Sequence, residues 1–430
     1  MAAARLTATV AHPLAGLALE LARAGLAAVD PQRLVRAELE QRPVDATALL
    51  ALGKAAAAMA AGVEPRGRPA LLVRPRSSPA LGGAGWEEIE GGHPVPDATS
   101  LVAGRRVHAF ASALGPGERL LVLLSGGASA CLERPAAGLS LADLAATNRA
   151  LLASGRAIDE VNAVRKHLST IKGGGLLRAT SARVVVLLLS DVPGDDPATV
   201  ASGPFAADPT TFADALAAVD GLEIPLAVRR HLEAGARGER RETLGAHAPE
   251  LVRVEHRLLA GRAAAADAAA AAAAAQGIAV TRVLLTGDAE TAAVHLVEAG
   301  RRLAGERVAL VASGETTVEL GESPGIGGRN QQLALAAAQE LAGASGELLL
   351  ALATDGVDGA SPAAGAIVDG TTWARIVAAG IDPRVALAGR NATPALSAAD
   401  ALLAGGASGT NVADLVVYLR DRRQATGGLR

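Results

Sequence analysis

Five short apolar runs recur along the chain, and each ends in small or acidic residues before a stretch typical of a helix. With their following turns, these runs cover residues 120–129, 184–196, 283–290, 308–317 and 348–359. Continuous Val/Leu runs of this length suit parallel strands that are buried on both faces. Because the strands alternate with helical stretches, the pattern predicts an α/β fold.

The turns after these runs carry polar and glycine residues that favour a binding site. In an open α/β sheet, ligands bind beyond the carboxyl ends of the strands, so we expect these turns to line the site. The turns contain Ser125, Gly126, Gly127, Asp191, Asp195, Asp196, Asp288, Glu315, Asp355 and Asp358. Any single turn is equally well explained as a helix cap. Five such turns together favour a polar cleft that handles anions and metal ions.

Length and charge narrow the class of protein. With 430 residues the chain is long enough for two or three domains. A segment rich in Arg, Glu and Gly, between about 225 and 260, predicts a boundary, and we place the domains at 1–245 and 246–430. The formal net charge of -3 provides no basic face for nucleic acid or for an anionic membrane. We therefore expect neither as a partner.

We also expect no targeting or membrane segment. The longest run of small apolar residues, 262–275, is nearly all alanine and is interrupted by Asp267, whereas a membrane span needs about 20 strongly apolar residues. The single cysteine, Cys131, fits a reducing compartment. These features predict a cytoplasmic protein, and they leave the oligomeric state open.

Standard nucleotide motifs are missing. Gly53 and Lys54 would end a P-loop, but Ala48 stands where its first glycine is required and Ala55 follows the lysine. Residues 325–330 fail the G-x-G-x-x-G pattern at its last position. The absence of a dinucleotide fingerprint weighs against a dehydrogenase.

Glycine-rich turns with many hydrogen-bond donors remain as candidates. Residues 125–129, Ser-Gly-Gly-Ala-Ser, would offer N–H groups and hydroxyls to a phosphate. Only three of the 41 basic residues are lysines, and two of them, Lys166 and Lys172, lie in the segment 165–175 that ends in three glycines. This segment predicts either an anion site or a solvated basic helix end.

The remaining cationic candidates are Lys54 and Arg329. Lys54 follows the apolar run 49–53, at a junction where a lysine either meets an anion or extends to the surface. Arg329 precedes an Ala/Leu helix, where its guanidinium would bind a carboxylate through two hydrogen bonds unless it is a surface charge.

Paired carboxylates in two of the turns favour a magnesium site. Mg²⁺ prefers one or two carboxylates together with substrate phosphates. The candidate ligands are Asp191, Asp195, Asp355 and Asp358. His93, in a Gly-Gly-His-Pro turn, is equally well explained as structural.

Nine segments, in this order, resemble the glycerate 2-kinases that join an N-terminal glycerate-kinase domain to a MOFRL domain. The segments are 53–60, 91–100, 123–135, 162–174, 188–204, 314–318, 327–336, 353–370 and 408–415. The resemblance covers nearly the whole chain. It implies two Rossmann-like α/β domains with a cleft between them, the glycerate-kinase domain over 1–245 and the MOFRL-containing domain over 246–430. The implied reaction transfers the γ-phosphoryl group of ATP to the 2-hydroxyl of D-glycerate, with Mg²⁺, to give 2-phosphoglycerate.

The resemblance places the family's functional residues at Lys54, Asp191 and Arg329, which we expect to be catalytic. Together with the residue patterns, it gives as substrate or nucleotide contacts Ser125, Gly126, Gly127, Ser129, Lys166, Lys172, Gly173, Gly174, Asn330 and Asp355. Arg329 would bind the glycerate carboxylate, and Lys54 would meet substrate or the transferring phosphoryl charge. Asp191 would orient or deprotonate the 2-hydroxyl, or hold Mg²⁺.

Two other functions stay open. Some relatives carry the name hydroxypyruvate reductase, so an NAD(P)H-dependent reductase is the enzyme alternative, and a non-catalytic sensor of sugar acids is the binding alternative. The chain departs from the family pattern at Phe205, Gln332, residues 391–393 and the turn after Asp288. These departures leave the three catalytic candidates in place. They bear on metal ligands and nucleotide preference, and the acceptor range, including tartronate and hydroxypyruvate, stays open.

Overall fold

The computed structural model describes residues 6–83, 85–321 and 325–425, and the chain divides into two compact units. The N-terminal unit comprises Pro31–Gly261, and the C-terminal unit comprises Met1–Asp30 with Arg262–Arg430. This division differs from the expected boundary at 245/246 in two ways. The start of the chain groups with the C-terminal unit, and residues 246–261 stay with the N-terminal unit.

A six-stranded sheet forms the centre of the N-terminal unit. Its strands are β1 Ala48–Leu52, β2 Ala70–Pro75, β3 Glu87–Gly91, β4 Arg119–Leu124, β5 Arg183–Leu189 and β6 Val254–Ala260. They lie in the order β3-β2-β1-β4-β5-β6, and every neighbouring pair is parallel. The central strands β1 and β4 are buried almost throughout, so the prediction of buried parallel strands is confirmed for this sheet.

Strand β6 lies within the segment 225–260 that predicts a domain boundary. It is an edge strand whose residues are mostly exposed or partly exposed. Its Arg257 forms ion pairs with Glu255 on the same strand and with Glu38 in helix α2 (Pro31–Gln41). A strand with this composition lacks the continuous apolar run that marked the others, so the segment resembles a linker.

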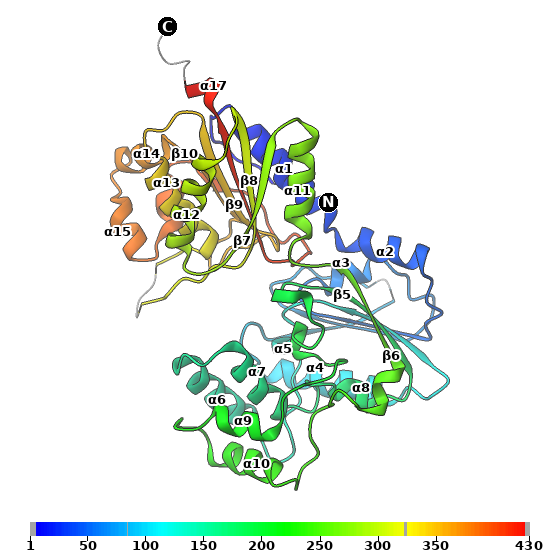
Figure 1. Ribbon diagram of the computed structural model, residues 1–430. Helices are drawn as coiled ribbons and strands as arrows, with labels where there is room; N and C mark the ends of the chain where they lie inside the picture. Colours follow the sequence, from blue (N-terminus) through cyan, green and yellow to red (C-terminus); the bar gives the residue numbers. More distant parts are fainter. Residues whose placement is uncertain (1–5, 84, 322–324, 426–430) are drawn as a thin grey trace. The chain divides into compact units, whose positions relative to one another are not determined.

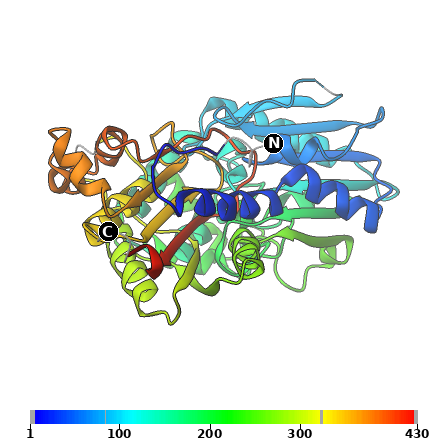
Figure 2. The same ribbon diagram turned by 90° about the horizontal axis from the view of Figure 1, so that it is seen from above.

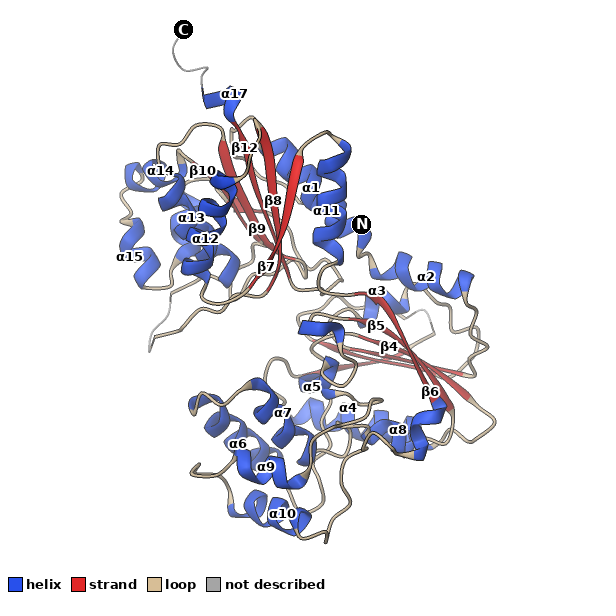
Figure 3. Cartoon of the chain, in the orientation of Figure 1, coloured by secondary structure: helices blue, strands red, loops and turns tan. Residues whose placement is uncertain are grey.

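The helices of the N-terminal unit fall into two groups (Figures 1 and 3). Those near the sheet are α2 Pro31–Gln41, α3 Ala56–Ala60, α4 Ala98–Ser112, α5 Ala128–Cys131 and α8 Gly175–Ala179. The others form a helical cluster with its own apolar core: α6 Leu141–Ala153, α7 Ile158–His167, α9 Phe212–Ala218 and α10 Leu226–Ala236.

The C-terminal unit also has a six-stranded sheet, but that sheet is mixed. Its strands are β7 Ala279–Leu285, β8 Arg307–Gly314, β9 Glu347–Ala353, β10 Gly365–Asp369, β11 Leu402–Leu403 and β12 Asp414–Asp421. The order is β11-β10-β9-β12-β8-β7, and among these pairs β7 and β8 are parallel whereas the others are antiparallel.

The prediction of parallel neighbours is therefore wrong for the run at 348–359. Strand β9 lies between two antiparallel strands, β12 and β10. Both β9 and β12 are buried on both faces, and it is this burial, rather than strand direction, that produces a continuous apolar run.

Helices cover both faces of the C-terminal sheet, which confirms the α/β class (Figure 1). One face carries α12 Ala289–Arg302, α13 Arg329–Leu341, α14 Thr372–Ala378, α15 Pro383–Ala388 and α16 Ala392–Ala398. The other face carries α1 Ala15–Ala28 and α11 Ala264–Ala275, and a short helix, α17 Arg422–Ala425, follows β12. Figure 2 shows α1, in blue, within the same unit as the red β12. Among the described residues, no helix is both long and apolar enough to cross a membrane.

Candidate active site

The turn after β4 is joined to the turn after β1 by hydrogen bonds. The Ser125 hydroxyl accepts a hydrogen bond from the Ala55 N–H at 3.0 Å and donates to the Leu52 carbonyl at 3.3 Å. The Lys54 N–H donates to the Gly126 carbonyl at 2.9 Å. The Ser125 side chain is fully buried and joins the two turns, and the Lys54 backbone lies beside the Ser-Gly-Gly turn.

Asp191, just beyond β5, lies against the same turn. A β-carbon added at Gly126 would lie 2.0 Å from Oδ2 and 2.6 Å from Oδ1 of Asp191. A side chain at position 126 would therefore displace the carboxylate. Gly126 is required here because the Asp191 side chain occupies the space that a β-carbon would need.

Gly127 is enclosed by two further candidate residues. Its φ of 84° is in the left-handed region that favours glycine. A β-carbon at Gly127 would lie 2.9 Å from Cγ of Lys54 and 3.3 Å from Nε2 of His93. We call Lys54, His93, Gly126, Gly127 and Asp191 the glycine-lined site. Its glycines open the short helix α5.

The loop around Lys172-Gly173-Gly174 adjoins this site through residues 202–203. The Ser129 and Ser202 hydroxyls are 2.9 Å apart. The Gly173 N–H donates to the Ser202 carbonyl at 3.0 Å, and the Gly174 N–H donates to the Gly203 carbonyl at 2.7 Å. Both glycines have positive φ, 55° and 77°. The structure thus connects the two predicted glycine loops.

The lysines of that second loop have other partners. Lys166 Nζ donates to Oδ1 of Asp208 at 3.1 Å, and Lys172 Nζ pairs with Glu133. All four side chains are at least nine-tenths buried. Lys166 and Lys172 line a cavity of about 540 Å³ with the segment 239–243. Both lysines are therefore buried and paired rather than solvated at a helix end, and their role as substrate or nucleotide contacts stays a prediction.

In the C-terminal unit, Arg329 begins α13 and is held by two carboxylates. Its Nε and Nη2 donate to the two oxygens of Asp414, at 2.5 and 3.0 Å, and its Nη1 contacts Glu315. Burial alone would lower the pKa of Arg329, but the hydrogen bonds and charges of Asp414 and Glu315 raise it. Burial raises the pKa of Asp414 to about 6, against the opposing effect of Arg329.

Asp358 caps the start of the same helix. Its Oδ1 accepts hydrogen bonds from the N–H and the side-chain amide of Asn330, and its Oδ2 accepts one from the Gln331 N–H. Burial raises the pKa of Asp358, and these hydrogen bonds oppose the shift. We call Arg329, Glu315, Asp414 and Asp358 the arginine site. Asp355 lies three residues before Asp358 in the same loop, and its Oδ1 accepts a hydrogen bond from the Val357 N–H at 3.2 Å.

Comparison with known proteins identifies the family of this chain. A domain of unknown function, DUF4147, matches residues 17–234, and the MOFRL family matches residues 308–414. The D-glycerate 2-kinase of Thermotoga maritima is 37% identical over 94% of this chain and 97% of its own length. The chain belongs to the glycerate 2-kinase family.

Other relatives also match this glycerate 2-kinase family member over most of its length. The glycerate 2-kinase of Pyrococcus horikoshii is 36% identical over 86% of each chain. A putative hydroxypyruvate reductase of Agrobacterium vitis is 40% identical over 92% of each chain. The crystal structure of the Thermotoga maritima glycerate kinase superposes with a TM-score of 0.82 and covers 94% of this chain and 99% of that chain.

Two of the predicted metal ligands have other contacts in this structure. Both oxygens of Asp358 accept hydrogen bonds from the start of α13, so Asp358 caps that helix, and its role as a metal ligand stays a prediction. Asp195 lies against Gly261 at the end of β6, where a β-carbon would come within 2.1 Å of its Oδ2. Within the described ranges, no group of three or more His, Cys, Asp and Glu side chains has the arrangement of a metal centre.

Three residues of these sites were missed or undervalued from the sequence. His93 follows β3, so its position beyond the carboxyl end of a strand was a signal that could have identified it. Glu315 follows β8 and was named only among the turn residues. Asp414 is the first residue of β12, and no local pattern marks it, because its role depends on pairing with a residue 85 positions away.

Proposed function

We propose that this protein phosphorylates D-glycerate at the 2-hydroxyl, using ATP, to give 2-phosphoglycerate. The observation that carries the proposal is the glycine-lined site, where Lys54, His93 and Asp191 meet the Ser-Gly-Gly turn in a chain whose relatives include glycerate 2-kinases. Kinase chemistry requires a nucleotide as the second substrate. Phosphoryl transfer depends mainly on alignment and charge neutralisation, and this site offers both.

Three parts of the glycine-lined site have a role in this proposal. Lys54 supplies a point charge to the transferring phosphoryl group. The Ser125 N–H already donates to the Leu52 carbonyl, so in this proposal it is the N–H groups of residues 126–129 that contact phosphate oxygens. Asp191 orients the 2-hydroxyl of glycerate and accepts its proton as the new O–P bond forms.

The same site fits Mg²⁺. The Asp191 carboxylate lies against the Ser-Gly-Gly turn, in the space that a β-carbon at Gly126 would need. One carboxylate together with nucleotide phosphates satisfies the usual preference of Mg²⁺. Asp191, with Asp195 nearby in the chain, would hold the ion, which would neutralise phosphate charge.

Arg329 binds the glycerate carboxylate. Its planar guanidinium suits a carboxylate, and its charge is secured by the pairing that raises its pKa. Glycerate phosphorylated at the 2-position keeps its carboxylate, so this contact persists from substrate to product.

The decisive experiment measures ADP release with D-glycerate, ATP and Mg²⁺, and identifies the product by phosphorus NMR. We expect a 2-phosphoglycerate signal that disappears when the metal is chelated and returns when Mg²⁺ is restored. A 3-phosphoglycerate signal would retain the kinase but overturn the assignment of the 2-hydroxyl. NADH oxidation with hydroxypyruvate, without ATP, would replace the proposal by a reductase.

A further inference from the structure

We propose that Asp414 is the positioning residue that fixes the guanidinium of Arg329, and that Glu315 is an internal carboxylate that the substrate displaces from it. This inference rests on the proposed function, in which Arg329 binds the carboxylate of glycerate. It assigns two different roles to two carboxylates that contact one arginine.

Asp414 has the geometry of a permanent partner. Its side chain is 0% exposed, and it binds Nε and Nη2 of Arg329 with both oxygens. As the first residue of β12, it pairs in register with Gly314 on β8 and Ala353 on β9. A carboxylate anchored at the start of a strand that lies between two others cannot leave without breaking a buried charge pair, which is costly. The Nε–Nη2 edge of Arg329 is therefore occupied throughout.

Glu315 has the geometry of an exchangeable partner. Its side chain is 46% exposed and belongs to the loop after β8, and it meets Arg329 only at Nη1. The Arg329 side chain is itself 33% exposed, so solvent reaches this pair. If Glu315 swings into water, Arg329 stays neutralised by Asp414. The loss is then only that of a partly exposed ion pair, which contributes little to stability.

The charges around Arg329 favour the exchange of Glu315 for the substrate carboxylate over the binding of an additional carboxylate. Arg329 carries one positive charge, while Asp414, Glu315 and Asp358 all act on it as negative neighbours. A further carboxylate entering beside Glu315 would meet like charge, which disfavours binding. A substrate carboxylate that replaces Glu315 at Nη1 leaves the charge balance unchanged, because one carboxylate substitutes for another of the same chemistry.

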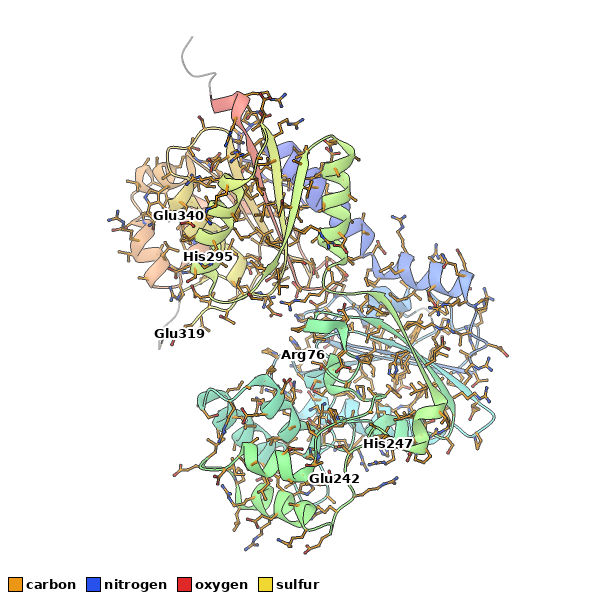
Figure 4. All side chains as sticks on the ribbon, viewed as in Figure 1. Arg76, Glu242, His247, His295, Glu319 and Glu340 are labelled. Carbon is orange, nitrogen blue, oxygen red and sulfur yellow. The ribbon has the colours of Figure 1, made fainter. Side chains whose placement is uncertain are left out.

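The test compares Glu315→Gln with Glu319→Gln in the full-length protein. Glu319 is an exposed carboxylate on the same loop and serves as the matched control (Figure 4). Removing the competing charge at 315 lowers the KM for D-glycerate about two- to fivefold and leaves kcat nearly unchanged. The control variant keeps both constants. An unchanged or raised KM in Glu315→Gln would overturn the role of Glu315 as a displaced carboxylate.

Asp414 is tested by the near-isosteric Asp414→Asn and by Asp414→Glu. We expect Asp414→Asn to raise the KM for D-glycerate at least about tenfold, with part of the loss recovered in Asp414→Glu because the charge returns. An Asp414→Asn enzyme with normal KM would overturn the positioning role. If Asp414→Asn does not fold, the Glu315 comparison still decides whether one carboxylate is exchangeable.

Arg329→Ala separates this inference from the proposed function. If Arg329→Ala leaves the KM for D-glycerate unchanged, Arg329 does not bind the substrate and the proposed function loses that contact. If Arg329→Ala raises KM but Glu315→Gln does not lower it, only the exchange between carboxylates fails.

Discussion

The glycine-lined site and the arginine site are assembled by opposite means. In the first, functional side chains come close because β-carbons are absent: Gly126 and Gly127 leave the space that Asp191, Lys54 and His93 occupy. In the second, the functional side chain is held by charge, since Arg329 lies between Asp414 and Glu315. The two sites should therefore respond differently to added volume and to lost charge.

This difference follows from the two sheets. The parallel sheet of the N-terminal unit ends several strands at one edge, and the turns there need only small residues to bring backbone and side chains together. In the mixed sheet, β12 runs against β8 and β9, so its first residue lies beside the carboxyl ends of both neighbours. An antiparallel strand thus places its first residue, Asp414, at the edge of the sheet where β8 and β9 end. In a parallel sheet, only the turns after the strands would lie at that edge.

The largest effect is expected from volume at Gly126. In Gly126→Ala, the new methyl group would collide with the Asp191 carboxylate, 2.0 Å away, and would displace it. Because a misplacement of about 1 Å can cost about 100-fold in rate, we expect kcat/KM to fall at least about 100-fold. Steady-state kinetics measures the loss.

Gly117→Ala is the matched control for this variant. Gly117 precedes β4 and has no neighbouring atom within 4 Å of a β-carbon position, so we expect near-normal activity. Retention of activity in Gly126→Ala would mean that Asp191 is not needed where the structure places it. The glycine-lined site would then lose its steric basis.

The second prediction compares Lys54 with Lys166, both of which the sequence predicts to contact substrate or nucleotide. Lys54→Ala removes the proposed phosphoryl contact, so kcat should fall at least about tenfold while Tm moves by less than about 4 °C. Lys166→Ala leaves Asp208 buried without its ion-pair partner, which costs about 3–5 kcal/mol in the free energy of unfolding. Thermal melts and kinetics on both variants distinguish the roles, and a stable but inactive Lys166→Ala would return that lysine to the substrate contacts.

The third prediction concerns a methyl group added next to the arginine site. A β-carbon at Gly328 would lie 2.3 Å from Cγ and 2.4 Å from the backbone carbonyl carbon and oxygen of Asp358. Gly328→Ala should therefore shift this backbone, disturb the cap of α13 and lower the free energy of unfolding by about 1–3 kcal/mol. Arg329 follows directly, and the KM for D-glycerate should rise severalfold with little change in kcat. Gly321→Ala, where no atom lies within 4 Å, should change neither. A larger fall in kcat than the rise in KM would mean that this site, too, depends on exact packing.

The sequence predicted the glycine-lined site better than the arginine site for a physical reason. Residues at 53–54, 125–129 and 191 lie directly after apolar runs, so strand periodicity alone places them at one edge of a sheet. The pairs Lys166–Asp208, Lys172–Glu133 and Arg329–Asp414 depend instead on contacts between residues 39 to 85 positions apart. Composition marks such residues as charged, but only the tertiary structure shows that the charges neutralise one another.

The smallest effect concerns Cys131, which lies behind the glycine-lined site. Its thiol donates to the Gly127 carbonyl at 3.3 Å, and burial raises the pKa of this thiol to about 12, although the charge of Lys54 opposes the shift. Only the thiolate reacts with iodoacetamide, and at pH 8 a thiol with this pKa is ionised to about 1 part in 10,000. Labelling of the folded protein should therefore be slow at pH 8, should accelerate about tenfold per pH unit, and should become fast in urea. If labelling is equally fast with and without urea, the packing around Cys131 beneath Gly127 exposes the thiol in the folded protein. The glycine-lined site would then not be the rigidly packed one of the two sites.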